Sequence, residues 1–297
     1  MTVILPRDYH GRKALLDRRI DCITHERAVQ QDIRALRIGI LNIMPQAKTY
    51  EYNLLFPLGR SVMQINPIWI KLKNHSYKST SEEHLANLYV YFEDAVREKH
   101  LDGLIVTGAP VEAIPFEEVT YWDEISQILT YARKNIASTM GLCWGGLALA
   151  KMLGMDKESF PQKLFGVYEA RNLDRTHRIT GEFDDVFYLP QSRHSGITDK
   201  VMEQKRDQGE INLLAYSSVA GYVIFESSDK RYLIHLGHPE YDENRLIDEY
   251  KRDKKQGLAS AGWPENVQFH NPVNIWRCNG LEFFSQWIKD VYERTPY

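Results

Sequence analysis

A single cysteine lies in a glycine-rich segment whose spacing is typical of a catalytic strand-to-helix turn. Residues 141–146 read GLCWGG, so glycines stand two residues before and two residues after Cys143. Glycines at these positions let two backbones approach closely, and the sharp turn presents the central side chain at its apex. Cys143 is therefore a candidate thiol nucleophile. The alternative is a small buried cysteine at an ordinary strand end, because cysteine is among the most buried residue types.

A thiol nucleophile needs a base, and one histidine stands beside a carboxylate at a suitable spacing. His238 follows the apolar segment YLIHL and opens the string HPEYD, which places Glu240 two residues later. In an extended segment alternate side chains share a face, so the Glu240 carboxylate can reach the His238 imidazole. A carboxylate in that position fixes the tautomer and stabilises the imidazolium. The alternative is a core histidine beside a surface glutamate.

No pattern typical of a metal site or of a phosphate-binding loop occurs in the chain. Neither a His/Asp/Glu set at ligand spacing nor a glycine-rich loop of the P-loop or dinucleotide type is found. His235 lies among apolar neighbours, and we interpret it as a structural residue. The histidines without a partner at a suggestive spacing are His84, His177, His194 and His270. We expect no metal site and no bound cofactor.

The elements that must position Cys143 and His238 alternate between strands and helices. Buried strands are predicted at 37–43, 65–72, 102–110 and 136–143, and helices at 82–96, 116–134 and 144–153. This alternation predicts an α/β fold with a mostly parallel central sheet and helices on both faces. Such sheets bind ligands at the carboxyl ends of their strands, where Cys143 and the GAP turn at 108–110 fall.

The pattern of apolar segments changes after Gly154. These segments become shorter and more varied, which predicts antiparallel or mixed pairing for the additional strands of the C-terminal half. Two further helices are predicted, at 243–257 and 281–294.

Composition narrows the possible partners. The 297 residues carry a net charge of −3 with acids and bases interspersed, so we expect no nucleic-acid partner. No apolar run approaches the ~20 residues of a membrane helix, so we expect no membrane partner. Three cysteines, odd in number and far apart, predict a reducing, cytoplasmic location.

Several further stretches, in order from about residue 30 to the C-terminus, carry a family resemblance. They include LNIMP (41–45), DGLIVTGAPVE (102–112), KLFGVYE (163–169), PQSRHS (190–195) and HNPVNIWR (270–277). Together with GLCWGG and GHPEYD, they resemble the homoserine O-acyltransferases of methionine biosynthesis (the MetA family), within the class I glutamine amidotransferase superfamily. The resemblance implies a flavodoxin-like amidotransferase core over residues 31–297, after an N-terminal extension over 1–30, as a single acyltransferase domain.

The resemblance also implies roles for individual residues. Cys143 would be the acyl-accepting nucleophile, His238 the base and Glu240 its partner, and the backbone N–H of Trp144 would help to hold the oxyanion. Substrate-binding roles fall on Lys163, Ser192 and Arg252, with Arg252 on the homoserine carboxylate. The alternatives are solvated surface charges for Lys163 and Arg252, and a turn residue for Ser192. A role for Lys48 in binding coenzyme A is left open, as is the role of the 257–275 loop.

The implied reaction is ping-pong acyl transfer from an acyl-coenzyme A co-substrate to L-homoserine. Glu112 bears on the acyl group, because the family associates glutamate at this position with acetyl and glycine with succinyl. A second carboxylate ~4 Å from Glu112 would cost about 4 kcal/mol at an effective dielectric of ~20. We therefore predict a homoserine O-acetyltransferase, and the family's habit suggests a homodimer. The alternatives are a succinyl donor, a glutamine amidotransferase with the same Cys-His-Glu triad, and a non-catalytic binding protein.

Overall fold

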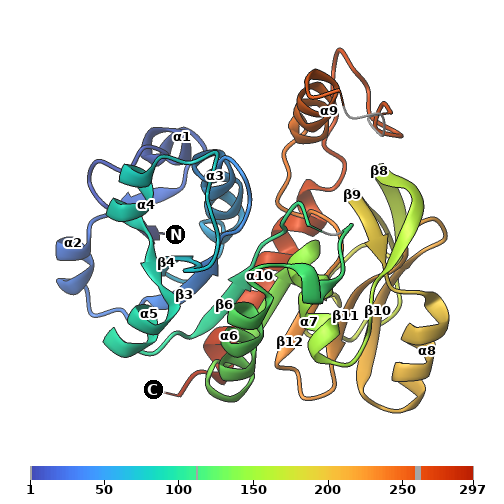
Figure 1. Ribbon diagram of the computed structural model, residues 1–297. Coiled ribbons are helices and arrows are strands. Elements are labelled where there is room, and N and C mark those ends of the chain that lie inside the picture. The colour runs from blue at the N-terminus through green and yellow to red at the C-terminus, as the bar shows by residue number, and fades with distance from the viewer. Residues whose placement is uncertain (1, 112, 258–261, 297) are drawn as a thin grey trace.

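One twelve-stranded sheet organises the chain, which the computed structural model describes over residues 2–111, 113–257 and 262–296 (Figure 1). The strands are β1 (Thr2–Ile4), β2 (Asp21–Ile23), β3 (Leu36–Leu41), β4 (Ile65–Lys71), β5 (Val90–Tyr91), β6 (Gly103–Val106), β7 (Ser138–Leu142), β8 (Glu158–Asn172), β9 (Val186–Gly196), β10 (Ile211–Ser217), β11 (Gly221–Ser227) and β12 (Tyr232–His235). The helices are α1 (Arg12–Asp17), α2 (His25–Val29), α3 (Ala47–Leu58), α4 (Glu82–Leu88), α5 (Phe92–Glu98), η1 (Phe116–Glu118), α6 (Trp122–Asn135), α7 (Trp144–Met152), α8 (Asp199–Asp207), α9 (Arg245–Lys255) and α10 (Arg277–Arg294).

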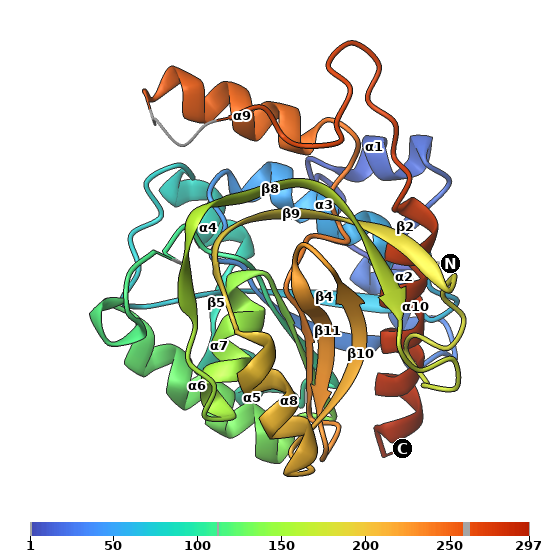
Figure 2. The same cartoon turned by 90° about the vertical axis from the view of Figure 1, so that its right-hand side faces the viewer.

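The sheet is parallel in its first part and antiparallel in its second. The strand order is β2-β1-β4-β3-β6-β7-β12-β11-β10-β8-β9, with β5 beside β4. All pairs from β2 through β12 are parallel, and all pairs from β12 through β9 are antiparallel. Figure 2 shows the long β8–β9 hairpin arching over the rest of the sheet. The predicted α/β fold is confirmed, and so is the change of pairing in the C-terminal half.

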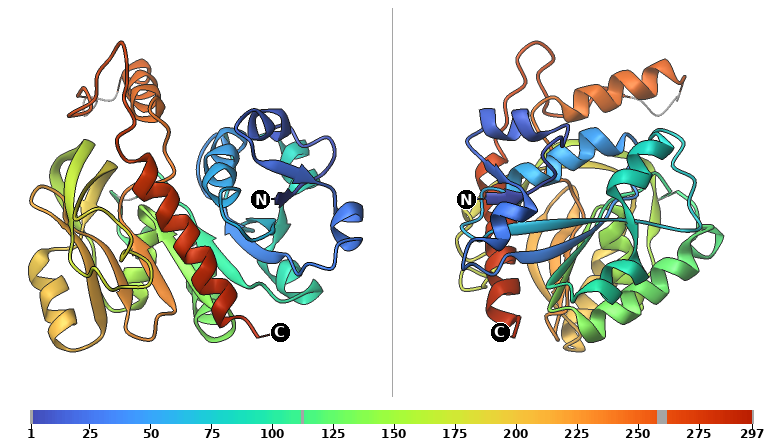
Figure 3. Two further views of the ribbon diagram at one scale, coloured as in Figure 1. Left: turned by 180° about the vertical axis from the view of Figure 1, so that it is seen from behind. Right: turned by 90° about the vertical axis from the view of Figure 1, so that its left-hand side faces the viewer.

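Helices cover both faces of the sheet, as predicted. On one face, Ile38 of β3 belongs to the same buried cluster as Leu54 of α3 and Trp287 of α10. On the other face, Leu104 of β6 belongs to a cluster with Leu147 of α7. Figure 3 shows α10 running along its face of the sheet. The parallel strands are therefore buried on both sides, which explains their continuous apolar sequences.

Two predicted helices are wrong in extent. The segment 82–96 is broken into α4 and α5 by a short strand, β5, because Tyr89 is extended (φ −103°, ψ 136°) and buried. The Tyr89 hydroxyl lies 2.8 Å from both Asn42 Nδ2 and Glu51 Oε1. These contacts come from distant parts of the chain and override the local helical pattern. The segment 116–134 likewise divides into η1 and α6, and Phe116 packs against Trp122.

The N-terminal residues pack on their own chain. β1 pairs in parallel with both β2 and β4, so residues 2–23 extend the sheet at its first edge. The side chains of Val3, Leu15 and Ile20 are fully buried in the same cluster as α3. No helix within the described ranges combines the length and apolar character needed to cross a membrane.

Candidate active site

The candidate catalytic residues follow three neighbouring parallel strands. β7 lies between β6 and β12, so the carboxyl ends of all three strands meet at one edge of the sheet. Gly108 follows β6, Cys143 follows β7 and His238 follows β12. A methyl group built on Gly108 would lie 3.5 Å from Cys143 Cβ and 3.6 Å from His238 Cε1. The fold therefore brings the GAP turn, the thiol and the imidazole together.

Cys143 occupies a strained turn between β7 and α7. Its backbone has φ 50° and ψ −114°, a conformation that non-glycine residues rarely adopt, and its N–H donates to His235 O at 2.9 Å. The flanking glycines are sterically required. A Cβ on Gly141 would lie 2.6 Å from Gly145 O, and a Cβ on Gly145 would lie 2.2 Å from Val106 O. The structure thus contains the predicted strand-to-helix turn, with the thiol at its apex.

His238 and Glu240 form a buried pair behind the thiol. His238 Nδ1 lies 2.7 Å from Glu240 Oε1, and the imidazole stacks on the Tyr241 ring with centroids 4.0 Å apart. Burial alone would lower the pKa of His238, but the neighbouring Cys143 and Glu240 outweigh burial and raise it well above its ordinary value. The arrangement therefore favours an imidazolium beside the cysteine.

A tyrosine that the sequence did not single out holds the same carboxylate. The hydroxyl of Tyr50, on α3, donates to Glu240 Oε1 at 2.6 Å, and both side chains are buried. Burial and then Glu240 raise the pKa of Tyr50 well above its usual value, so the phenol stays protonated and keeps donating. Glu240 Oε2 is buried and has no hydrogen-bond partner among the described residues. One carboxylate oxygen thus accepts from both His238 and Tyr50.

His235 has the structural place predicted for it. It is buried at the end of β12, and its Nδ1 accepts a hydrogen bond from Gly237 N at 3.0 Å. Burial, and then the nearby His238, lower the pKa of His235 to about 3, so this ring stays neutral.

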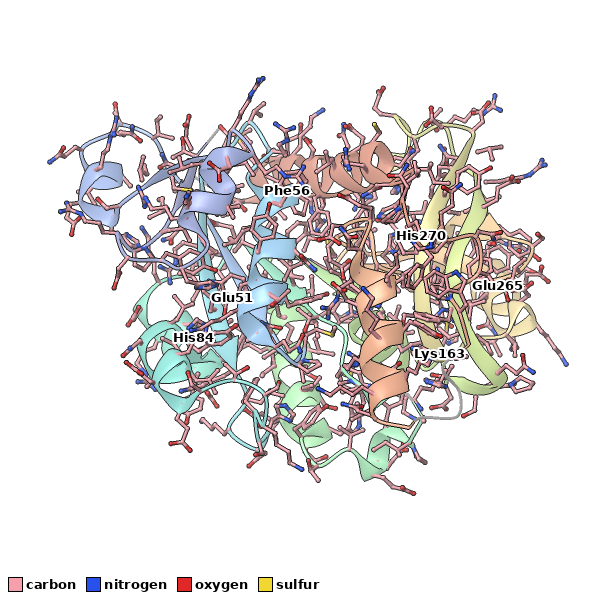
Figure 4. The ribbon with its side chains drawn as sticks, turned by 90° about the horizontal axis from the view of Figure 1, so that it is seen from above. Glu51, Phe56, His84, Lys163, Glu265 and His270 are labelled. Carbon is pink, nitrogen blue, oxygen red and sulfur yellow. The ribbon has the colours of Figure 1, made fainter. Side chains whose placement is uncertain are left out.

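A cavity of about 420 Å³ opens beside Cys143 and His238, and the three predicted substrate-binding residues all line it. Lys163 Nζ lies 3.2 Å from Asp253 Oδ2, and its side chain is only 8% exposed, so it is not a solvated surface charge. Arg252, from α9, has a partly exposed side chain whose Nε donates to Asp253 at 2.8 Å. Ser192 lies within β9 rather than in a turn. In Figure 4, Lys163 lies beside α9.

Glu249 is a cavity residue that sequence analysis missed. It is buried on α9, accepts from Ser192 Oγ and from the Tyr241 hydroxyl at 2.6 Å each, and lines the cavity with Arg252. Burial would raise the pKa of Glu249, but His238, Arg245 and Lys163 overcome it and hold the pKa below its usual range. The available signal was its position three residues before Arg252, which places both on one helix face.

The remaining predicted residues divide into three cases. Trp144 is the first residue of α7, where helices leave backbone N–H groups without an internal acceptor. Glu112 lies outside the described residues, although Pro110 and Ala113 both line the cavity. Lys48 is exposed on α3, and it is not among the described residues that line the cavity.

The described part of the 257–275 loop is attached to β8. Glu265 N donates to Phe165 O at 2.9 Å, and Val167 N donates to Glu265 O at 3.0 Å. Trp263 packs against Tyr250 of α9 with ring centroids 5.0 Å apart. Figure 4 shows Glu265 next to β8. These contacts anchor the segment between β8 and α9.

Solved structures share this fold at low sequence identity. A glutamine amidotransferase from Thermotoga maritima matches with a TM-score of 0.55 and 13% identity, over 87% of this chain and 99% of that one. A glutamine amidotransferase from Methylobacillus flagellatus matches with a TM-score of 0.55 and 13% identity, over 90% of this chain and 98% of that one. These likenesses confirm the amidotransferase-like fold.

Sequence comparisons identify the family. A family model described as homoserine O-succinyltransferase matches residues 2–297. A homoserine O-acetyltransferase of Bacillus subtilis is 37% identical over 100% of this chain and 99% of its own length. A homoserine O-acetyltransferase of Geobacillus kaustophilus is 38% identical over the same shares. Because these matches extend over essentially the whole chain, the protein belongs to the homoserine acyltransferase family.

Proposed function

We propose that this protein is a homoserine O-acetyltransferase, which transfers an acetyl group from acetyl-coenzyme A to the hydroxyl of L-homoserine and so serves methionine biosynthesis. The observation that carries the proposal is the placement of Cys143, His238 and Glu240 at one edge of the sheet, beside the cavity, in a chain of this family. The curated relatives named homoserine O-acetyltransferase support the acetyl donor.

The first half-reaction acylates the cysteine. The Cys143 thiolate attacks the thioester carbonyl, and the N–H of Trp144 and the GAP turn stabilise the oxyanion. The new C–S bond to Cys143 forms as the C–S bond to coenzyme A breaks. The imidazolium of His238 supplies the proton that the departing coenzyme A thiolate takes up. The strained turn suits this role because it fixes the sulfur before substrate binds.

The second half-reaction passes the acetyl group to homoserine. Neutral His238 removes the proton from the γ-hydroxyl, the oxygen attacks the acyl carbon, and the bond to Cys143 breaks to restore the thiolate–imidazolium pair. The cavity suits an amino-acid substrate, because Arg252 can pair with its carboxylate while Glu249 offers a negative partner for its ammonium group. Ser192 donates a hydrogen bond to Glu249, and Lys163 pairs with Asp253, the neighbour of Arg252.

The acyl donors to compare are acetyl-coenzyme A and succinyl-coenzyme A. The family model is described by succinyl transfer, whereas the relatives quoted above are named for acetyl transfer. Glu112 favours acetyl, since its carboxylate would repel the free carboxylate of a succinyl group. The proposal therefore assigns donor selection to Glu112.

The decisive experiment measures homoserine-dependent release of coenzyme A from acetyl-coenzyme A and from succinyl-coenzyme A. We expect turnover with acetyl-coenzyme A, a mass increase of the protein by one acetyl group without homoserine, and loss of both in Cys143→Ala. Cys278→Ala, which removes an exposed thiol, is the matched control and should retain both. Equal turnover of the two donors would refute the acetyl assignment. Ammonia release from glutamine without acyl transfer would instead support an amidotransferase.

We also propose a cytoplasmic homodimer. The three cysteines are all free, which fits a reducing compartment. Light scattering of the purified protein checks the dimer, and a single-chain mass would contradict it.

A further inference from the structure

A second cluster of chemically active side chains lies outside the acyl-transfer site. It consists of His10, Glu51 and His84, whose ligand-type atoms all lie within 4.8 Å of one another. His84 Nε2 lies 2.7 Å from Glu51 Oε1, and His10 Nε2 lies 3.6 Å from Glu51 Oε2. Glu51 is on α3 and His84 is on α4, and Figure 4 shows the two residues on adjacent helices. Three separate segments of the chain therefore meet at one carboxylate.

The carboxylate of Glu51 is fully buried and is held by two further hydroxyl groups. Tyr9 donates to Oε2 at 2.8 Å, and Tyr89 donates to Oε1 at 2.8 Å. An ionised carboxylate has about four acceptor positions, two on each oxygen. Tyr9 occupies one position on Oε2, and Tyr89 occupies one position on Oε1. The second position on Oε2 faces His10, and the second position on Oε1 faces His84. Hydroxyl groups that fix a carboxylate in this way are typical of the outer shell of metal sites.

We propose that His10, Glu51 and His84 bind one divalent transition-metal ion, of which zinc is the representative. Two imidazole nitrogens and one carboxylate suit zinc, cobalt or nickel, whereas calcium and magnesium prefer oxygen ligands alone. Ligands about 2.1 Å from a tetrahedral zinc ion lie roughly 3.4 Å apart. The two imidazoles approach different oxygens of Glu51, His10 at 3.6 Å from Oε2 and His84 at 2.7 Å from Oε1, and one ligand atom from each of the three residues lies within 4.8 Å of the other two. Small rotations of the two imidazoles would therefore bring three ligand atoms to this spacing.

Binding exchanges a proton for the metal. Without metal, His84 Nε2 shares a proton with Glu51, and Lys48 O lies 3.2 Å from His10 Nε2 as an acceptor for its proton. The ion takes the lone pairs of both Nε2 atoms, so a neutral ring moves its proton from Nε2 to Nδ1, and an imidazolium releases its Nε2 proton to solvent and keeps the one on Nδ1. The His10 side chain is 33% exposed, which gives the ion a way in from solvent. The ion would tie the N-terminal segment to α3 and α4.

The test is cobalt and zinc binding to the whole protein. It uses a Cys278→Ser background, because that exposed thiol is itself a soft metal ligand. We expect one Co²⁺ per chain with visible absorption bands of low-symmetry coordination, displaced by Zn²⁺, and a rise in Tm of about 5 °C at 100-fold excess of Zn²⁺ over Kd. His10→Ala and His84→Ala should each weaken Co²⁺ binding at least tenfold. The matched control is His100→Ala, at an exposed histidine outside the cluster, which should bind as the background protein does.

The result that overturns the proposal is equal Co²⁺ affinity in the control and in His10→Ala, or no saturable binding at all. The cluster would then be a hydrogen-bonded network that joins three segments. His10→Ala keeps the test informative if His84→Ala fails to fold, because it leaves the bond between His84 and Glu51 in place. The binding readout does not depend on acyl transfer, so this inference and the proposed function stand or fall separately.

Discussion

Replacing Tyr50 with phenylalanine tests whether the hydrogen bond behind the His238–Glu240 pair contributes to catalysis. The substitution removes one hydroxyl that donates to Glu240 Oε1 at 2.6 Å and keeps the buried ring. A hydrogen bond to a charged group contributes about 1.5–3 kcal/mol, which corresponds to roughly 10- to 150-fold in rate. We expect the loss toward the lower end of this range, because His238 still donates to the same oxygen.

The expected loss falls on kcat rather than on KM. Without the Tyr50 hydroxyl, Glu240 Oε1 loses one of its two donors, so its remaining hydrogen bond to the His238 imidazolium becomes stronger. Burial lowers the pKa of His238, and the neighbouring Cys143 and Glu240 outweigh burial and raise it. A stronger hydrogen bond from the imidazolium to Glu240 would raise the pKa of His238 further. Attack by homoserine needs neutral His238, so the acidic limb of the kcat/KM profile for homoserine should move to higher pH in Tyr50→Phe. This shift separates a positioning role from a purely structural one, which would lower Tm without moving the profile.

The assay is steady-state coenzyme A release across a pH series, with Tyr52→Phe as the matched control. Tyr52 lies two residues away on α3, where its ring stacks on Phe56 with centroids 6.4 Å apart. The control should retain wild-type kcat and pH dependence. Wild-type kcat and an unmoved acidic limb in Tyr50→Phe would refute the reasoning, and the contact would then serve packing alone.

Three further substitutions test other parts of the site. Arg252→Ala should raise the KM for homoserine by roughly tenfold to a hundredfold, the effect of losing a charged hydrogen bond, while burst acylation is unchanged; Lys251→Ala, at its exposed neighbour, should leave KM unaltered. Gly145→Ala should abolish soluble expression or lower Tm steeply, because its Cβ would lie 2.2 Å from Val106 O, and a near-wild-type melting curve would contradict this. Glu112→Gly should gain succinyl-coenzyme A turnover, and steady-state kinetics with both donors would expose a failure to do so.

The central sheet and the grouping of the three candidate catalytic residues could be predicted from sequence because their signals are local. Continuous apolar runs mark β3, β6 and β7, and the glycines around Cys143 report a backbone constraint within six residues. His238 and Glu240 are two residues apart, so an extended chain already brings them together. Local spacing therefore predicts which side chains gather at the carboxyl ends of these strands.

Tyr50 and Glu249 were missed because their partners are distant in sequence. Tyr50 and Glu240 are 190 positions apart, and Ser192 and Glu249 are 57 positions apart. The break at Tyr89 has the same origin, since its hydroxyl contacts Asn42, directly after β3, and Glu51 on α3 rather than residues of the adjacent α4. Contacts of this range depend on how the helices pack on the sheet, which hydrophobic periodicity does not specify.

The position of β12 between β7 and β11 has a consequence for how activity arises during synthesis. The turn that carries Cys143 can form from one strand and the helix after it, whereas the imidazole arrives only when β12 inserts beside β7, nearly a hundred residues later in the chain. Long-range parallel pairing of this kind forms slowly. A nascent or truncated chain that lacks β12 would carry Cys143 without His238, so it would not form the acyl-enzyme. Acyl-enzyme formation would thus report completed folding.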